Sequence, residues 1–351
     1  MALLTTTIGA YPKPDYIPTP DWFREGVAGL SNPTEAYHKY MANLPDNNIE
    51  EILDRGTREV VNDQVNVGVD IPTDGEVRRE NYIHYHCRHI DGIDFSDLAQ
   101  KVSRQGAWVA NLPTVTGPLK ARNHFLPRDY SIAQAAIDRP VKITVPGPMT
   151  ITDSIADVYY NDDKRLGSAL AAALNEEILT LAEAGCSWIQ IDEPVFARKP
   201  DTAIEYGFEN LERCFQGVPD HVTRAVHMCC GYPDYLDQEN FQKADHMAYF
   251  QIADAIEDSS IRAISLEDAH RHNNLSLLEH FKTTTVMLGV VAIAKSRIET
   301  VEEIADRLQA ALNHIDADRL LAAPDCGLGF FNRELALAKL ENMVTAAKAV
   351  G

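Results

Sequence analysis

Residues 166–194, LGSALAAALNEEILTLAEAGCSWIQIDEP, contain the pattern that decides the fold. Apolar side chains in 166–184 recur about every three and four residues, which predicts a helix. A short apolar run at 188–194 follows and predicts a β-strand, which ends in the polar pair Asp192 and Glu193. The run is apolar on both faces, as expected for a strand of a parallel sheet that helices cover.

The same alternation of strand and helix patterns extends along the chain. Further strands are expected at 3–10, 69–76, 141–146, 223–230, 261–267, 286–292 and 320–326, and further helices at 49–67, 247–258, 301–314 and 333–350. Strands that alternate with helices indicate an α/β fold with a parallel sheet. Eight such units predict a closed (β/α)8 TIM barrel, and we expect residues 1–351 to form a single domain.

Two stretches of the sequence are longer than the connections of a minimal barrel require. Residues 15–44 are rich in proline, aromatic and polar residues, and are expected to form an N-terminal segment that covers one mouth of the barrel. Residues 82–139 separate the second and third strands by too much. Within them, GAWVANLPTVTG at 106–117 alternates in a way that predicts a β-hairpin excursion.

Composition narrows the class of partner. The chain has 351 residues, 45% of them hydrophobic, and a formal net charge of −20. A surface this acidic repels nucleic acid and anionic membranes, so a small molecule or a protein is the expected partner. The first residues lack a secretory signal pattern and no run could span a bilayer, which predicts a cytoplasmic protein. Oligomeric state is not predicted.

Polar residues gather where the predicted strands end. The first strand ends in Ile8, Gly9 and Ala10, the second in 74–76, DGE, and the fourth at Asp192. Active sites of (β/α)8 barrels lie at the carboxyl ends of the strands. These residues are therefore candidates for contact with substrate, although Asp192 and Glu193 could also be a simple helix N-cap.

Soft metal ligands follow three other strands. His227 and Cys229 lie two apart and so share one face of a strand, Glu267 ends the next, and Cys326 follows Pro-Asp at the end of the last. Zn²⁺ favours cysteine sulfur and histidine nitrogen, so the set predicts a zinc site. The alternatives are a hydrogen-bonded core histidine at His227 and, for Glu267, an ordinary carboxylate bonded to Arg271 or His270.

Two thiolates and an imidazole indicate a particular zinc chemistry. If Glu267 is a weak fourth ligand, a substrate thiol can displace it and bind through sulfur. The metal lowers the pKa of that thiol, and an electron-rich ligand set leaves the sulfur nucleophilic. Hydrolytic zinc sites more often use histidine-rich or carboxylate-rich sets. The pattern therefore favours alkylation of a thiol over hydrolysis.

At this point the chain resembles the catalytic, C-terminal domain of cobalamin-independent methionine synthases. The matching motifs are TTTIGAYP at 5–12, DGE at 74–76, GPMTI at 147–151, IQIDEP at 189–194, HMC at 227–229, Glu267 and PDCGL at 324–328. The resemblance implies the same barrel and a zinc-dependent homocysteine S-methyltransferase. It implies zinc ligands at His227, Cys229, Glu267 and Cys326.

The resemblance also implies roles for the other strand ends. Asp192 and Glu76 would hold the homocysteine amino group, and Ile8, Gly9 and Ala10 would contact the amino acid. Three features are expected to depart from the family: Ala10 replaces a serine, the segment after GPMTI has no tryptophan for stacking on folate, and the 351 residues contain one barrel pattern where the full-length enzymes carry a second, N-terminal barrel. We therefore expect a non-folate methyl donor, such as methylcobalamin or a corrinoid protein.

One relative suggests an alternative. In epoxyalkane:coenzyme M transferases, a zinc-bound thiolate opens a small epoxide, and a sulfonate-bearing thiol would need a cation such as Arg78, Arg79 or Arg271. A metal-free lyase on the same barrel and a non-catalytic zinc-stabilised binding protein are hypotheses from other classes. Zinc analysis would test the first of these, and a thiol-induced change in the spectrum of cobalt-substituted protein would test the second.

Overall fold

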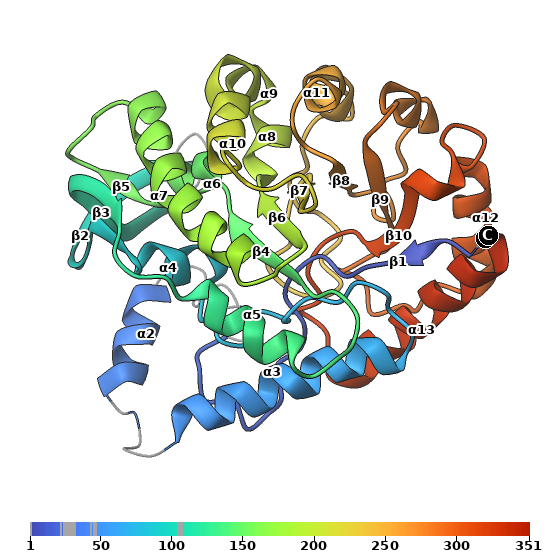
Figure 1. The fold of residues 1–351 in the computed structure, drawn as a ribbon, viewed down its shortest axis with the longest axis horizontal. Helices are drawn as coiled ribbons and strands as arrows, with labels where there is room; N and C mark the ends of the chain where they lie inside the picture. Colours follow the sequence, from blue (N-terminus) through green and yellow to red (C-terminus); the bar gives the residue numbers. More distant parts are fainter. Residues whose placement is uncertain (1, 22, 24–32, 43, 45–47, 104–107) are drawn as a thin grey trace.

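The computed structural model describes residues 2–21, 23, 33–42, 44, 48–103 and 108–351. A curled parallel sheet of seven strands forms the centre, in the order β1-β10-β9-β8-β7-β6-β4 (Figure 1). Its strands are β1 (Leu4–Thr5), β4 (Lys142–Pro146), β6 (Trp188–Asp192), β7 (Thr223–Met228), β8 (Ala263–Leu266), β9 (Thr285–Val291) and β10 (Leu320–Pro324). The predicted α/β class with a parallel sheet is confirmed.

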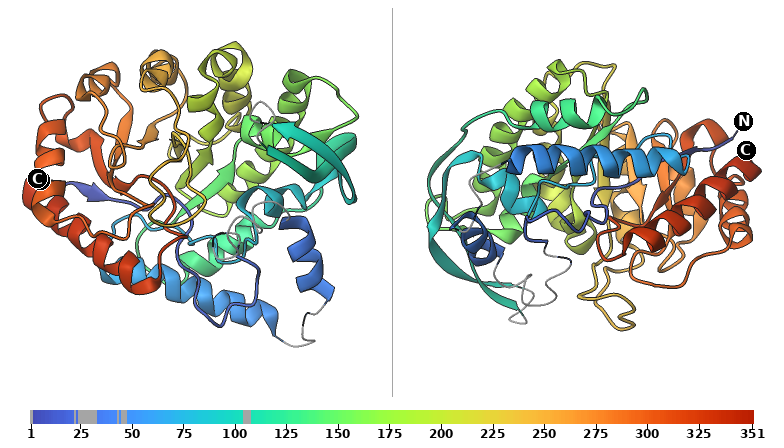
Figure 2. Two further views of the ribbon diagram at one scale, coloured as in Figure 1. Left: turned by 180° about the vertical axis from the view of Figure 1, so that it is seen from behind. Right: turned by 90° about the horizontal axis from the view of Figure 1, so that it is seen from below.

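Helices cover the convex side of the sheet, as the two further views show (Figure 2). They include α3 (Ile49–Asn66), α7 (Asp163–Glu183), α11 (Ala248–Glu257), α12 (Val301–Ala311) and α13 (Arg333–Val350), close to the predicted ranges. Residues of β4, β8 and β10 are buried throughout, because helices pack outside and side chains fill the inside. Thr300 and Glu303 form a capping box that begins α12.

The predicted strand at 69–76 is only partly formed. Two isolated parallel bridges, Thr6 with Ile71 and Thr73 with Lys142, place this segment between β1 and β4. The chain then turns at Gly75 and Glu76, whose φ angles are 67° and 56°. A regular ladder therefore does not continue to residue 76, and the turn directs Glu76 toward the carboxyl ends of the other strands.

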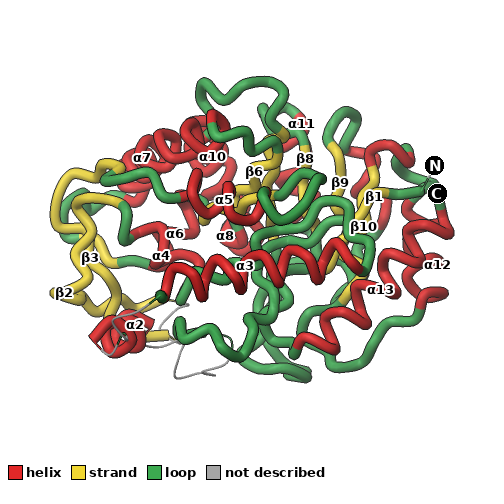
Figure 3. Tube along the Cα trace, turned by 60° about the horizontal axis from the view of Figure 1, so that its bottom comes forward, coloured by secondary structure: helices red, strands yellow, loops and turns green. Residues whose placement is uncertain are grey.

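The excursion between the second and third units is larger than the expected hairpin. Residues 82–139 contain α4 (Tyr82–Cys87), β2 (Ile90–Ser103), β3 (Trp108–Ala121) and α5 (Leu126–Gln134). β2 pairs antiparallel with β3 (Figure 3), and β3 also pairs with β5 (Ala156–Asp157), in a sheet separate from the seven strands. The connection 104–107 lies outside the described residues. Of the predicted cover segment, α2 (Pro33–Ala42) is described, whereas 22, 24–32 and 43 lie outside the described residues.

Short helices complete the described chain: α6 (Pro148–Ser154), α8 (Pro194–Arg198), α9 (Pro200–Thr202), the π-helix η2 (Ala203–Gly207), α10 (Phe208–Cys214), η3 (Leu275–His280) and η4 (Ala317–Arg319). Inside the curled sheet, a small apolar cluster of Ile8, Ile71, Ala225, Ala263, Met287, Leu321 and Ala323 fills the space below the strand ends. Among the described helices, none combines the length and apolar character that crossing a membrane would require.

Candidate active site

A cavity of about 1300 Å³ opens at the carboxyl ends of the strands. The predicted site residues that line it are Ile8, Gly9, Ala10, Glu76, Asp192, His227, Cys229 and Cys326. These residues are far apart in the sequence and meet because parallel strands end at the same edge. The position at strand ends predicted from sequence therefore corresponds to one continuous cavity.

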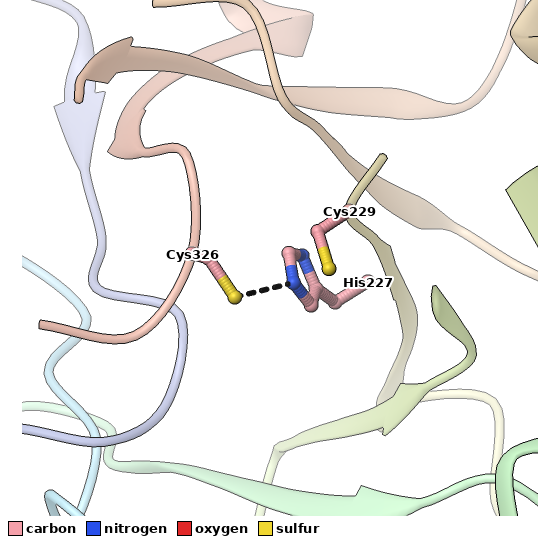
Figure 4. Close-up of side chains that lie close together, drawn as sticks. All are labelled: His227, Cys229 and Cys326. Carbon is pink, nitrogen blue, oxygen red and sulfur yellow. Dashed lines mark hydrogen bonds between the residues drawn. The ribbon is translucent and has the colours of Figure 1, made fainter. Parts of the chain in front are cut away.

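The imidazole and two of the thiols meet at the end of β7. His227 and Cys229 come from this strand and the loop after it, and Cys326 follows β10 (Figure 4). One ligand atom from each of the three lies within 4.8 Å of the others, and His227 Nε2 is 3.2 Å from Cys326 Sγ. One imidazole nitrogen and two sulfurs match the donors that Zn²⁺ prefers. The three residues could therefore hold a zinc ion.

A serine orients the histidine. Ser265 Oγ, on β8, lies 3.0 Å from His227 Nδ1, and both residues are buried. With Nδ1 occupied in this way, Nε2 points toward the cysteines. Metal-bound histidines usually have such a partner on the second ring nitrogen, because the bond fixes the ring and its tautomer.

The two thiols of this group differ in acidity. Hydrogen bonding to Cys326, assisted by His227, lowers the pKa of the Cys229 thiol. The hydrogen bond with Cys229 raises the pKa of the Cys326 thiol in turn. Two sulfurs this close cannot both ionise without a cation between them. The arrangement therefore favours a bound cation, which would stabilise both thiolates.

Glu267 lies beside this group but outside it. Its Oε2 accepts a hydrogen bond of 2.9 Å from the backbone N–H of Cys230, and its Oε1 forms an ion pair with Lys243. Of the two expected partners, His270 Nδ1 lies at an ion-pair distance of 3.9 Å from Oε1, whereas Arg271 donates to the carbonyl of Ala244 instead. Glu267 is therefore close to the cysteines while its carboxylate is held by other partners.

Asp192 lies next to His227 in the register of β6 and β7. Its Oδ1 accepts a hydrogen bond of 2.7 Å from Gln190 Nε2, and burial raises the pKa of Asp192 to about 7. A buried carboxylate with so few donors on it gains strongly from a cationic ligand. Its placement on the cavity wall makes such a ligand accessible.

Glu76 is a second buried carboxylate of the cavity. Its Oε1 accepts from Thr144 Oγ1 at 2.8 Å and lies 3.3 Å from Arg79 Nη1. A Cβ on Gly9 would come within 2.8 Å of this oxygen, so glycine leaves the space that the carboxylate occupies. Burial raises the pKa of Glu76, although Arg79 opposes the rise.

Glu193 differs from its neighbour Asp192. Its carboxylate accepts hydrogen bonds from the N–H groups of Met149 and Thr150 and from Thr150 Oγ1, at 2.7 to 2.9 Å. It makes no side-chain cap of α8, the helix that follows it, and instead satisfies the N-terminus of α6. The N-cap alternative therefore describes Glu193, at a different helix, and not Asp192.

The prediction that Arg78 and Arg271 contact substrate does not fit their placement, since neither lines the cavity. Arg78 pairs with Asp54, with Glu50 at 2.9 Å and with Asp129 at 3.5 Å. Arg271 Nη1 donates to the Ala244 carbonyl at 2.6 Å. Both guanidinium groups hold the structure around the site.

Four further residues of the site were not singled out by sequence. Tyr82 and Tyr232 line the cavity, Lys243 pairs with Glu267, and Ser265 orients His227. Ser265 gives a signal, because it is a polar residue within the buried strand that leads to Glu267. The tyrosines and Lys243 lie in the excursion and in a long loop, where strand periodicity gives no guide.

Comparison with known proteins agrees with this geometry. The family model described as "Cobalamin-independent synthase, Catalytic domain" matches residues 3–349. A methionine synthase of Saccharolobus islandicus strain Y.G.57.14 is 30% identical, over 99% of this chain and 95% of the relative. Another from Sulfolobus acidocaldarius is 29% identical, over 97% of this chain and 90% of the relative.

A solved structure is similar throughout. The B12-independent methionine synthase of Shewanella sp. W3-18-1, in complex with selenomethionine, has a TM-score of 0.84 and 29% identity, and covers 100% of this chain and 98% of its own. The chain therefore belongs to the cobalamin-independent synthase catalytic domain family, as the motifs predicted.

Proposed function

We propose that this member of the cobalamin-independent synthase family transfers a methyl group to the sulfur of homocysteine, with a zinc ion held by His227, Cys229 and Cys326. The carrying observation is the convergence of these three donors at a cavity wall that also contains Asp192. When bound, zinc would lower the pKa of a substrate thiol and keep its sulfur nucleophilic. We assign Glu267 as the fourth, exchangeable ligand.

The acceptor is an amino acid in this proposal. Asp192 and Glu76 would pair with the ammonium group, and the backbone at Ile8, Gly9 and Ala10 would contact the rest of the amino acid. The methionine synthase names of the relatives, and the selenomethionine held by the Shewanella protein, support an acceptor of this kind. The coenzyme M alternative is less well supported, because Arg78 and Arg271 are engaged away from the cavity and Arg79 pairs with Asp74 and Glu76.

We propose a methyl donor other than folate. The segment after α6 carries Asp157, Tyr159 and Tyr160 and no tryptophan. Without a large surface to orient a bulky donor, its methyl group would rarely be in line with the acceptor sulfur. A corrinoid protein docked at the open mouth would bring its own surface and orient its methylcobalamin from outside the chain. Methyl-tetrahydrofolate should turn over poorly in an assay with fixed homocysteine, and efficient turnover would refute this part.

The finer architecture is part of the proposal. Residues 71–73 would be the eighth member of the barrel, since their bridges reach both β1 and β4. β2 and β3 would form the hairpin of the excursion, and residues 1–351 would fold as one domain. The free cysteines suit a reducing compartment, which supports a cytoplasmic location.

The central test combines metal content with methyl transfer. Purified protein should hold about one zinc per chain, by the tetrahedral donor set. Cys229→Ser should lose both zinc and methylation of homocysteine. Cys186→Ser is a matched control, because Cys186 is buried in the core away from the cavity. Normal zinc and activity in Cys229→Ser would refute the proposed site.

A further inference from the structure

Lys243 lines the cavity, but it is neither a proposed zinc ligand nor a proposed contact of the amino acid. Its Nζ forms an ion pair with Glu267 Oε1 and lies 4.6 Å from the centre of the Phe241 ring. The side chain of Glu267 is 3% exposed and that of Lys243 is 15% exposed. The pair is therefore largely shielded from water and touches the cavity at one end.

The loop that carries Lys243 is fixed to the strand that carries the soft ligands. It leaves β7 after Met228 and returns at Ala244, whose N–H donates to the Cys230 carbonyl at 2.7 Å. Arg271 then donates to the Ala244 carbonyl at 2.6 Å. Lys243 is consequently held at a set position beside Cys230, and its ammonium is not a mobile surface charge.

The Lys243 ammonium and the backbone N–H of Cys230 together bind both oxygens of a carboxylate. The Lys243 ammonium holds one oxygen of Glu267, and the Cys230 N–H donates to the other at 2.9 Å. The neighbouring Asp325 is a like charge that raises the pKa of Glu267 further above the value that burial alone would give. Without Lys243, an ionised Glu267 that has left a cation would be buried beside a second carboxylate.

We propose that Lys243 is a positioning residue for ligand exchange: it holds the Glu267 carboxylate whenever Glu267 does not coordinate zinc. The inference rests on the proposed function and deepens it. The substrate thiol gives up its proton to solvent and its sulfur takes the ligand position, and the Glu267 oxygen that leaves is received by Lys243. Lys243 would thus lower the free-energy cost of displacing Glu267.

The test compares Lys243→Met with Lys243→Arg, which keeps the charge, and with the matched control Lys199→Met. Lys199 lines the same cavity but pairs with Asp153, at 2.8 Å. Zinc retention is measured by competition with a chelator, and homocysteine affinity by titrating the visible spectrum of the cobalt-substituted protein. Neither measurement depends on turnover or on the methyl donor.

Lys243→Met should hold zinc more tightly without thiol and bind homocysteine about tenfold more weakly, since charge-assisted hydrogen bonds contribute at this scale. Lys243→Arg and Lys199→Met should resemble the wild type. In a Glu267→Gln background, Lys243→Met should no longer change homocysteine affinity, because the two residues act as one unit.

Each contrary outcome has a separate meaning. If Lys243→Met equals Lys199→Met while Glu267→Gln weakens zinc retention, Lys243 does not assist exchange and the inference is wrong. If Glu267→Gln leaves zinc and homocysteine binding unchanged, Glu267 is not a ligand and both the inference and the fourth-ligand assignment fail. If Cys229→Ser also keeps zinc, the proposed function fails.

Discussion

Two groups of ligand-like side chains lie near each other at the carboxyl ends of the strands, and their hydrogen bonding is opposite. The first is His227, Cys229 and Cys326, and the second is Glu267, His270 and Asp325. Each places three potential ligand atoms within 4.8 Å of one another. Proximity alone therefore does not separate a metal site from a structural cluster.

Hydrogen bonding separates them. Asp325 accepts bonds of 2.8 Å from the N–H groups of Asp268, Ala269 and His270 and one of 2.6 Å from His270 Nδ1. His270 Nε2 in turn accepts from the N–H of Ala294. The polar atoms of Asp325 and His270 are therefore satisfied within the protein, whereas the sulfurs of Cys229 and Cys326 contact chiefly each other and His227.

Within the second cluster, Asp325 and His270 therefore act as a scaffold for the first, and Glu267 lies between the two. Asp325 precedes Cys326 in sequence, and the loop that it holds begins directly after Glu267. Strand β9 passes so close that a side chain at Gly289 would collide with the Asp325 carboxylate. By fixing this loop, Asp325 sets where Cys326 and Glu267 stand relative to His227.

The largest expected effect breaks the first cluster. Cys326→Ser should lose nearly all bound zinc and all methyl transfer, because a hydroxyl is a poor replacement for a thiolate on Zn²⁺. Its unfolding transition should remain cooperative. Metal analysis by mass spectrometry after dialysis checks the zinc content, and a zinc-loaded, active Cys326→Ser protein would remove the distinction between the clusters.

The same distinction applies to Asp192, the last residue of β6, and to Glu193, which follows it. Asp192 faces the cavity with Gln190 as its partner, and should be a substrate residue. Asp192→Asn should weaken homocysteine binding by about 2–5 kcal/mol, the usual cost of removing one partner from a buried charge pair. In the wild type, binding should weaken as the pH falls below about 7, because the raised pKa of Asp192 leaves the carboxyl neutral there.

Glu193→Gln is the matched control for that measurement. Glu193 is satisfied by α6, so its loss should lower stability and leave the pH dependence of homocysteine binding in place. Calorimetric titrations with homocysteine between pH 6 and 8, a range of about two units around the pKa of Asp192, would compare the variants. Equal losses for homocysteine and for a thiol without an amino group in Asp192→Asn would argue against ammonium recognition.

The two kinds of residue also differed in how well sequence revealed them. His227, Cys229, Cys326 and Asp192 stand at ends of apolar runs, and strand periodicity placed them at one edge. Glu267 was predicted from the sequence, but its ion-pair partner Lys243 was not. Lys243 ends the loop 231–243, whose sequence shows no regular spacing of apolar residues. Arg78 and Arg271 were misplaced, since charge alone does not tell which carboxylates compete for a guanidinium.

The prediction of a regular strand at 69–76 was only partly right, for a related reason. Apolar alternation described its start, but the turn at Gly75 and Glu76 is set by contacts that form only in the fold, such as that between Glu76 and Thr144. The excursion likewise pairs with β5, a short segment about forty residues farther along, which local patterns cannot reveal.

A smaller effect is expected from breaking the scaffold. Asp325→Asn should lower the free energy of unfolding by about 2–3 kcal/mol, since it weakens charged hydrogen bonds to a buried loop, yet should keep zinc. Burial would raise the pKa of Asp325, but the bonds from His270 and the loop outweigh it and lower the pKa.

The direction in which pH changes the stability follows from the lowered pKa of Asp325. A lowered pKa means that ionised Asp325 stabilises the fold above its unfolded-state pKa, and that this contribution is lost as acid protonates it. The wild type should therefore lose more stability on acidification than Asp325→Asn, which chemical denaturation at several pH values would measure. If Asp325→Asn folds normally but releases zinc, Asp325 itself contributes to the metal site and is not only a scaffold.

The smallest effect on zinc affinity is expected at Ser265, which contacts His227 of the first cluster but is not itself a proposed zinc ligand. Ser265→Ala removes the partner of His227 Nδ1, 3.0 Å away, and leaves every proposed zinc donor in place. The imidazole can then rotate or change tautomer, so zinc affinity should fall by about tenfold, at the lower end for such partners. Ser265→Thr keeps a hydroxyl and should restore most of it. Chelator competition on the three proteins would show the order, and an unchanged affinity in Ser265→Ala would mean that strand β7 alone orients His227.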